Sequence, residues 1–497
     1  MVVRIVHWIF VIVLTVIGIL LALGGGVLSY LGGSWYYLIA GLATLTVSVM
    51  MVRRHKLAPQ IYTGILAVTL VWAIVESGLD FMALLPRLAA WMVVGAWFFM
   101  PWYRHTLAKR YATNLPNYRT WLGGALASSA AVLGISALQP YTKNAEGSVR
   151  VAADDAPVTD WRQYGNSNGG SRFAELDQIN VETVGNLQEV WRYRTGVEDD
   201  FKMTPLQVDG RLFICTARNI LIALDDASGA EIWRFDPEAE PPAAHQYART
   251  CRGISYYETP RSYSGECRKR LVMGTIDARL MAINADTGAP CADFGDRGAV
   301  NLRSGLSPHG KNDYYVTSPP LVADDVFVVG GLVNDSQMLG LPSGVVRAFD
   351  AITGEFVWAW DVGNPSHNGE PVEGEFYTPG TPNVWSIMSY DPDLDLIYAP
   401  TGNANPDWFG GERRAFDEEW SAAVVAINAE TGTPAWKFQT VHHDVWDYDV
   451  PAQPVLVDVE KAGELVPSVA IPTKRGEIFL VDRRDGTTVH PIEERPV

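Results

Sequence analysis

The pattern of apolar residues divides this chain of 497 residues into two parts. Before residue 140, apolar residues fill five nearly continuous stretches, roughly 5–23, 35–52, 60–79, 81–102 and 121–138. Each stretch approaches the ~20 residues that an α-helix needs to cross a bilayer. A cleavable signal peptide would explain only the first stretch, and buried core helices seldom follow one another in this way. The pattern predicts a membrane anchor of five transmembrane helices over residues 1–140.

Beyond residue 186, short apolar β-rich runs replace these stretches, and one signature recurs. Each run ends at Asp or Asn and is followed by a turn containing Gly and often by Trp. The copies are LIALDDASGAEIWRFD (221–236), LMAINADTGAPCADFG (280–295), VVRAFDAITGEFVWAWD (345–361), VVAINAETGTPAWKFQ (424–439) and IFLVDRRDGTTVHPIE (478–493). Their turn glycines lie 54 to 78 residues apart, which is too far for single hairpins and typical of four-stranded propeller blades with insertions. Stacked sandwiches are the alternative, but the repetition favours an all-β propeller of about five blades over residues 186–497.

The tryptophan of the signature has a structural role in this interpretation. Its ring is suited to dock between neighbouring blades, next to a turn glycine with positive φ. The second and fifth copies lack Trp, so docking there must use other groups.

A periplasmic linker is expected over residues 141–185. The chain stops at Val497 directly after a copy, and five copies do not obviously close a large ring, so we expect the propeller to be incomplete.

Charge separates the same two parts and predicts an orientation. Up to Leu138 the chain carries nine basic and two acidic residues, a balance of +7, whereas the remainder carries −24. The acidity argues against nucleic acid as a partner. Basic residues lie before the first span, after the second and between the fourth and fifth, so the positive-inside rule places the N-terminus in the cytoplasm and the region after Pro140 outside. The bilayer is thus the first expected partner.

All four cysteines fall in the exported part, where disulfides form. Three pairings are possible, and the sequence does not choose among them. Cys267 with Cys291 is preferred, because these two residues bracket one apparent hairpin. The absence of a CxxCH motif argues against covalently attached haem.

The densest polar cluster is the segment 441–453, directly after a blade signature. Its carboxylates Asp444, Asp447 and Asp449, with two histidines, suit a metal site, a general base, or both. A turn whose Asp side chains bind backbone amides is the alternative. Asn403 suits a hard cation or a turn, and Lys474 suits an anionic ligand or solvent.

Taken together, these features resemble the membrane-bound quinoprotein dehydrogenases, the pyrroloquinoline quinone (PQQ) enzymes of the glucose/quinate/shikimate family. The resemblance covers the whole chain and includes TDWRQYGNSNGGSRFAELDQIN (159–180), TCRGISYYE (250–258), HHDVWDYDVPAQP (442–454) and PTKRGEIFLVDRRDG (472–486). It implies an eight-bladed propeller with PQQ near its axis above Ca²⁺ or Mg²⁺. Family members continue well beyond residue 497, so about three C-terminal blades are expected to be missing here.

The resemblance also implies roles for individual residues. Asp447 is similar to the catalytic base and to a metal ligand, and Lys474 to the cation beside the quinone oxygens. Trp385 is similar to the ring under the cofactor plane. The other implied site residues are Arg252, Thr317 and Ser318 for the cofactor, and Asn403 and Asp335 for the metal.

Two departures from the family pattern affect these roles. The adjacent cysteines that cover PQQ in related soluble enzymes are missing, and the His that the glucose enzymes carry before TCRG is replaced by Ala248. His245 is the candidate to substitute for that His. Asn403 tilts the substrate towards quinate or another polyol.

The resemblance implies a periplasmic enzyme of the bacterial inner membrane. It is expected to oxidise a sugar or cyclic polyol, with glucose first and quinate or shikimate as alternatives. Hydride is expected to pass to PQQ and electrons to membrane ubiquinone. A non-catalytic envelope scaffold is a competing hypothesis, and a catalytically inactive fragment is another.

Overall fold

The structure is a computed structural model, and it describes residues 2–30, 33–100, 103, 117–138, 149–151, 160–239, 250–308, 313–334 and 338–493. The chain forms two compact units. Residues 1–145 and 493–497 make up the first unit, and residues 146–492 make up the second.

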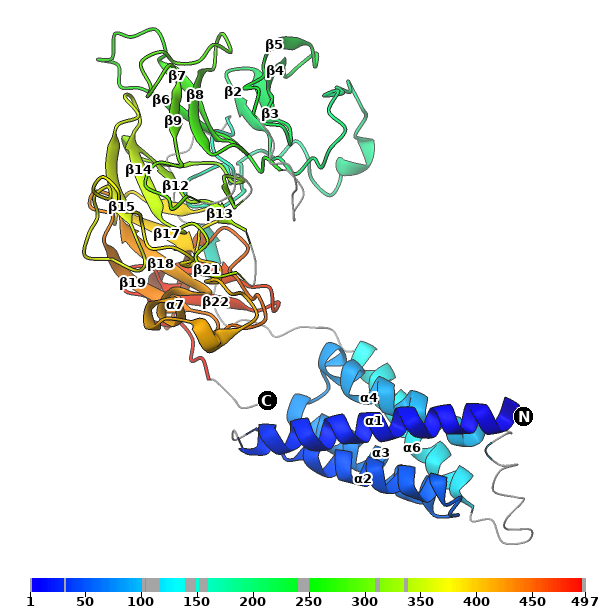
Figure 1. Cartoon of the computed structure of the whole chain (residues 1–497). Coiled ribbons are helices and arrows are strands. Elements are labelled where there is room, and N and C mark those ends of the chain that lie inside the picture. The colour runs from blue at the N-terminus through cyan, green and yellow to red at the C-terminus, as the bar shows by residue number, and fades with distance from the viewer. Residues whose placement is uncertain are drawn as a thin grey trace. The chain divides into compact units, whose positions relative to one another are not determined.

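The first unit is a bundle of apolar helices, blue to cyan in Figure 1. Among the residues described, four helical stretches are long and apolar enough to cross a membrane, and the helix Tyr36–Val52 is shorter. A Cβ on Gly41 would lie 2.3 Å from the backbone nitrogen of Ala22, so glycine permits close packing of the first two helices. The helices are α1 (Val2–Tyr30), α2 (Tyr36–Val52), α3 (Ala58–Ser77), α4 (Phe81–Ala96), continued by the turn η1 (Trp97–Phe99), and α6 (Tyr118–Leu138).

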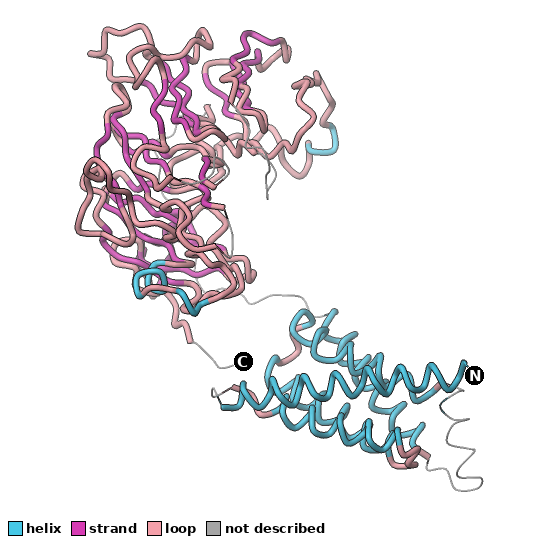
Figure 2. Tube along the Cα trace, in the orientation of Figure 1, coloured by secondary structure: helices cyan, strands magenta, loops and turns pink. Residues whose placement is uncertain are grey.

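The second unit consists of successive four-stranded antiparallel sheets (Figures 1 and 2). A small pairing of β10 (Tyr314–Tyr315) with β13 (Leu332–Val333) accompanies the third sheet. The sheets are, in order, β2 (Leu206–Val208), β3 (Arg211–Cys215), β4 (Leu221–Asp225), β5 (Glu231–Phe235); β6 (Ser255–Glu258), β7 (Lys269–Gly274), β8 (Arg279–Asn284), β9 (Ala299–Asn301); β11 (Leu321–Ala323), β12 (Val326–Val329), β14 (Val346–Asp350), β15 (Phe356–Trp360); β16 (Ser389–Asp391), β17 (Leu396–Pro400), β18 (Ala423–Asn428), β19 (Pro434–Gln439); and β1 (Val149–Val151), β20 (Val455–Lys461), β21 (Glu464–Pro472), β22 (Ile478–Asp482).

Part of the segment that was expected to be a linker belongs to this second unit. Strand β1 pairs antiparallel with β20 at the edge of the last sheet, far along the chain. Trp161 forms a backbone bridge with Gln207 of β2. These pairings attach the N-terminal end of the unit to both its first and its last sheet.

The signature tryptophans dock between successive sheets. The ring of Trp233 lies against the turn of Gly288, and its Nε1 donates to the carbonyl of Ala285 at 3.1 Å. The ring of Trp358 lies against Gly432, and its Nε1 donates to the carbonyl of Ala429 at 2.7 Å. These glycines have φ near +70°, and a side chain there would meet the indole. The docking predicted from the repeat is therefore present.

The junction between the second and third sheets lacks this tryptophan. There, different residues pack on the turn glycine and donate hydrogen bonds to the turn carbonyls. Phe294 and Val300 lie against the turn of Gly354, where the other junctions have an indole ring. Arg270 supplies the missing donor, because its guanidinium binds the carbonyls of Ala351 at 3.3 Å and Ile352 at 2.7 Å. A ring and a separate cation thus replace one indole.

Two disulfides close loops in the same part of the unit. One joins Cys267 to Cys291, as the hairpin argument favoured, and the other joins Cys215 to Cys251. The second bond attaches the TCRG segment to the end of β3.

Candidate active site

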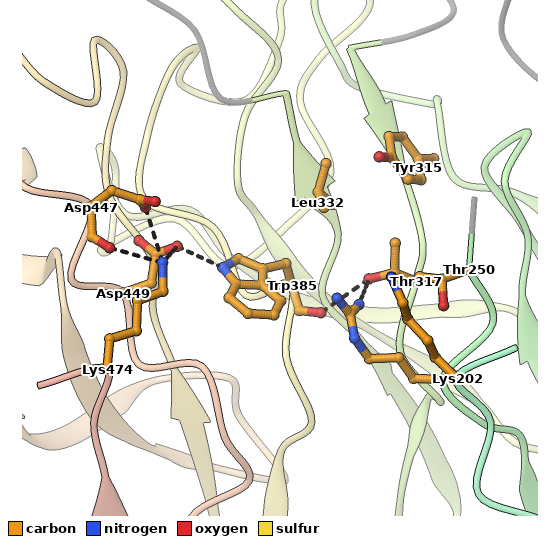
Figure 3. A pocket seen from close by; sticks show the side chains of 10 residues that line it. Lys202, Thr250, Tyr315, Thr317, Leu332, Trp385, Asp447, Asp449 and Lys474 are labelled. Carbon is orange, nitrogen blue, oxygen red and sulfur yellow. Dashed lines mark hydrogen bonds and ion pairs between the residues drawn. The ribbon is translucent and has the colours of Figure 1, made fainter. Parts of the chain in front are cut away.

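A pocket of about 280 Å³ lies where connections between the strands of several sheets converge (Figure 3). The residues come from segments separated by up to 272 positions, so only the folded unit creates this surface. The pocket is lined by Lys202, Thr250, Arg252, Tyr315, Thr317, Leu332, Trp385, Asp447, Asp449 and Lys474.

On one wall of the pocket, the ammonium group of Lys474 lies between the carboxylates of Asp447 and Asp449, as Figure 3 shows. The Nζ atom of Lys474 lies 3.2 Å from Oδ1 of Asp447 and 3.4 Å from Oδ2 of Asp449, and it donates to the carbonyl of Asp447 at 2.8 Å. Asp447 has φ of +60°, a conformation that Asp tolerates better than most residues and that is often found at functional sites. The turn between β21 and β22 and the segment before β20 are thereby joined.

The indole of Trp385 forms a flat surface between two cations. The guanidinium carbon of Arg252 lies 5.0 Å from its ring centroid, and the Nζ atom of Lys474 lies 6.0 Å from it. The carbonyl of Trp385 accepts hydrogen bonds from the hydroxyls of Thr317 at 3.2 Å and Ser318 at 2.6 Å. Arg252 in turn donates to the Thr317 hydroxyl. The arrangement suits a planar anion lying on the ring.

Asn403 provides buried polar atoms beside this wall. Asn403 is 4% exposed, and its backbone N–H donates to Oδ1 of Asp449 at 2.7 Å. Its side-chain amide lies beside the carboxylate of Asp444, yet neither amide atom makes a hydrogen bond of normal geometry. Buried polar groups without such a bond are uncommon and often mark the place of a ligand or ion.

Burial and neighbouring charges shift the pKa values of several groups in and beside the pocket. Burial alone would lower the pKa of Lys474, but the carboxylates of Asp449 and Asp447 outweigh it and raise this pKa. Burial raises the pKa of Asp444, although the backbone N–H groups of Trp446 and Tyr448 partly oppose that shift. Burial also lowers the pKa of Arg252. Lys474 therefore remains an ammonium group at neutral pH.

The structure brings most of the predicted site residues together. Asp447, Lys474, Trp385, Arg252 and Thr317 line the pocket, whereas Ser318 and Asn403 contact residues that line it. His245 and Asp335 lie outside the described residues.

The sequence did not indicate three polar residues that line the pocket, Lys202, Thr250 and Tyr315, and it indicated Asp449 only as a member of the polar cluster. Thr250 stands directly before the cysteine of TCRG, which could have indicated it. Asp449 was counted in the polar cluster, but its spacing alone did not separate it from a turn residue. Lys202 lies in an ordinary charged loop, where it pairs with Asp200 at 3.1 Å, and no sequence signal distinguished it.

Within the described residues, no group of three or more His, Cys, Asp or Glu side chains is arranged to hold a metal ion. Beside the pocket, the amide oxygen of Asn403 is of a type that binds hard cations such as Ca²⁺, which accept amide and carbonyl oxygens as well as carboxylates.

Comparison with known protein families gives a match to the second unit. A family model described as "PQQ: Glucose/ethanol/alcohol dehydrogenase, beta-propeller domain" matches residues 161–497. The match includes every described residue that lines the pocket.

Curated proteins resemble nearly the whole chain. Quinoprotein glucose dehydrogenase from Escherichia coli is 38% identical over 97% of this chain and 62% of that protein. Quinoprotein glucose dehydrogenase A from Acinetobacter calcoaceticus is 36% identical over 98% of this chain and 63% of that protein. Quinate/shikimate dehydrogenase (quinone) from Acinetobacter baylyi is 36% identical over 99% of this chain and 64% of that protein. The chain thus spans a little under two thirds of the length of these relatives.

Solved structures agree with the fold predicted from the sequence. Quinohemoprotein alcohol dehydrogenase from Comamonas testosteroni superposes with a TM-score of 0.57 at 25% identity, covering 67% of this chain and 49% of that chain. A europium-containing methanol dehydrogenase superposes with a TM-score of 0.55, also at 25% identity, covering 67% of this chain and 58% of that one. The prediction of a propeller preceded by apolar helices is confirmed.

Proposed function

This chain belongs to the PQQ family of glucose, ethanol and alcohol dehydrogenases with a β-propeller domain, and we propose that it oxidises a sugar or cyclic polyol. Glucose, oxidised to its lactone, is the first candidate substrate, and quinate or shikimate is the alternative. The observation that carries the proposal is the pocket in which Asp447 and Lys474 adjoin the ring of Trp385. Membership of a dehydrogenase family disfavours the hypothesis of a non-catalytic scaffold.

The pocket residues fit PQQ, a planar quinone that carries several carboxylates. The indole of Trp385 offers a flat apolar face, and Arg252 and Lys474 bring positive charge close to that ring. Aromatic faces bind flat rings, and guanidinium groups bind carboxylates with a matching geometry. When bound, PQQ supplies the hydride acceptor for the reaction.

A divalent cation also fits the residues at this wall. The buried amide oxygen of Asn403 lacks a normal hydrogen bond, as a cation ligand would before the ion binds. Asp447, and Asp335 outside the described residues, would complete an oxygen-rich set suited to Ca²⁺ or Mg²⁺. We include this cation in the proposal.

Asp447 would take the proton of the reacting hydroxyl group. Its side chain is 35% exposed and reaches the pocket, so a substrate can approach it. A carboxylate in this position acts as a general base, which typically contributes a factor of about 10² to 10⁴ to the rate. Lys474, held 3.2 Å away, would stabilise negative charge that develops beside it.

The apolar helices of the first unit support a membrane enzyme, and we propose that its electrons pass to ubiquinone. The described helices include four that are long enough to cross a bilayer. The basic residues predict a cytoplasmic N-terminus and a periplasmic second unit at the bacterial inner membrane. The curated relative from Acinetobacter baylyi is named as a quinone enzyme, which supports the choice of acceptor.

The test uses the full-length membrane protein, purified in detergent and loaded with PQQ and Ca²⁺ or Mg²⁺. Dye reduction is measured with glucose, quinate, shikimate and glycerol, before and after PQQ is added. We expect activity with glucose or quinate only after loading, and a loss of about 10² to 10⁴ in kcat for Asp447→Asn. The matched control is Asp286→Asn, which changes a surface carboxylate paired with Arg211 and should leave kcat unchanged.

Two results would contradict the proposal in different ways. A protein that binds PQQ and oxidises none of the four substrates would remove the substrate class. Undiminished kcat in Asp447→Asn would remove only the role of Asp447 as the base.

A further inference from the structure

Asp449 is a buried carboxylate in the wall of the pocket, and the proposed function gives it no role. Its side chain is 6% exposed, whereas that of the neighbouring Asp447 is 35% exposed. A carboxylate buried to this degree needs hydrogen bonds and a cation to compensate for lost hydration. Its partners therefore indicate what it does.

The partners of Asp449 come from three separate connections in the unit. Its Oδ2 accepts a hydrogen bond from Nε1 of Trp385 at 3.0 Å and lies 3.4 Å from Nζ of Lys474. Its Oδ1 accepts from the backbone N–H of Asn403 at 2.7 Å. These residues lie before β16, between β17 and β18, and between β21 and β22. One carboxylate thus fixes the indole, the ammonium group and the backbone of Asn403 relative to one another. Figure 3 shows the first two of these groups beside Asp449.

The close approach of Gly402 shows how little space surrounds these contacts. A Cβ at this position would lie 3.0 Å from Oδ1 of Asp449 and 3.2 Å from Nε1 of Trp385. Because glycine has no Cβ, the backbone at position 402 can lie beside the carboxylate of Asp449 and the indole of Trp385 without moving either.

We propose that Asp449 is a positioning residue that holds Trp385 and Lys474 in the geometry that binds PQQ. The proposal rests on the proposed function, because it concerns the same pocket. Asp447 faces the substrate, and Asp449 acts through the groups that it orients. Asp449 itself takes no proton from the substrate.

The main variant is Asp449→Asn, which keeps the shape of the side chain. The amide oxygen can still accept from the N–H of Asn403, but the amide nitrogen then faces the indole donor and the ammonium group. The dissociation constant for PQQ is measured by equilibrium dialysis of the full-length protein in detergent with Ca²⁺. We expect PQQ affinity to fall about tenfold or more, because a hydrogen bond to a charged acceptor is lost.

A double-mutant cycle separates positioning from a general loss of structure. Trp385→Phe keeps an aromatic ring but removes the five-membered ring of the indole with its Nε1, the donor that binds Asp449. The loss of ring area is common to both Trp385→Phe backgrounds and cancels in the cycle. If Asp449 acts through this indole, Asp449→Asn should weaken PQQ binding much less in the Trp385→Phe background than in the wild type. Equal effects of Asp449→Asn in both backgrounds would overturn the proposal.

Steady-state kinetics give a second readout on the same variants. Asp447→Asn should lower kcat while PQQ affinity changes little, whereas Asp449→Asn should weaken PQQ binding first. The matched control is Asp391→Asn, which removes a buried carboxylate that pairs with Arg483 at 2.6 Å and does not line the pocket. PQQ affinity should be unchanged in this control.

The outcomes distinguish the two proposals. Wild-type protein that binds no PQQ would refute the proposed function, whereas wild-type affinity in Asp449→Asn would refute only the positioning role. If Asp449→Asn does not fold, Gly402→Ala places a Cβ 3.0 Å from Oδ1 of Asp449 and 3.2 Å from Nε1 of Trp385, which crowds this hydrogen-bonded pair without changing any charge. Wild-type PQQ affinity in Gly402→Ala would then overturn the proposal, and weakened binding would support it.

Discussion

Replacing Arg270 by Met tests how one junction between sheets holds without its tryptophan. Arg270 is fully buried, and its guanidinium binds the carbonyls of Cys267, Ala351 and Ile352 at 3.0, 3.3 and 2.7 Å. It also pairs with Asp293 at 2.5 Å. Methionine keeps most of the apolar stem and removes every donor.

The expected loss in the free energy of unfolding depends on which partners of Arg270 can form hydrogen bonds with water instead. The side chain of Asp293 is 36% exposed, so solvent replaces most of what the ion pair contributes. Cys267 and Ala351 are buried, and a buried acceptor left without a donor costs about 1–3 kcal/mol. Removing a buried charge offsets part of this cost, because its desolvation penalty disappears. We therefore expect a net loss of about 2 kcal/mol, or a fall of about 3 °C in the unfolding midpoint for a unit of this length.

The assay compares thermal midpoints by near-ultraviolet circular dichroism, at one scan rate because unfolding of a large membrane protein is often irreversible. Trp358→Phe removes the Nε1 donor of a comparable junction together with part of a buried ring, so it should lower the midpoint as well. The matched control is Arg297→Met, which breaks a surface pair between side chains that are 90% and 84% exposed and should leave the midpoint unchanged. A midpoint for Arg270→Met equal to that of Arg297→Met would refute the idea that this guanidinium replaces an indole.

Three further predictions concern other parts of the chain. Replacing both Cys215 and Cys251 by Ser should weaken PQQ binding measured by dialysis, because this disulfide anchors the segment of Arg252, whereas the same change at Cys267 and Cys291 should lower only stability. Burial would raise the pKa of Asp482, but its hydrogen bonds to Arg484 outweigh burial and lower this pKa. The stability that Asp482 adds to the folded state is therefore present above the pKa of the unfolded state and is lost as pH falls. The unfolding midpoint of Asp482→Asn should therefore vary less with pH between about 5 and 3 than that of the wild type. Alkaline phosphatase fused after residue 140 should be active and after residue 55 inactive, and the reverse result would refute the predicted orientation.

Patterns that repeat along the chain could be predicted from the sequence. The apolar stretches correspond to α1, α2, α3, α4 and α6, because membrane helices depend mainly on local composition and length. The blade signatures lie on strands and turns whose glycines have positive φ, because the same local conformation recurs in each copy. The preferred disulfide between Cys267 and Cys291 also followed from local spacing.

Contacts between distant segments could not be predicted in this way. Strand β1 completes the last sheet about 300 residues further along the chain, and no local signal indicated that pairing. Arg270 replaces an indole only because Phe294 and the turn of Gly354 are brought to it by the fold. The sequence showed that a tryptophan was missing there, and it contained no signal for what replaced it.

Asp447 and Asp449 show the same limit within a single motif. They stand two positions apart in HHDVWDYD, and both are acidic, so composition and spacing give them equal weight as candidate bases. The backbone separates them: positive φ at Asp447 accompanies a side chain that is 35% exposed, whereas that of Asp449 is 6% exposed and binds Trp385 and Lys474. A base must reach its substrate, whereas a positioning group must be held by its neighbours. Exposure and hydrogen-bond partners, which no single sequence contains, therefore decide which carboxylate can do which task.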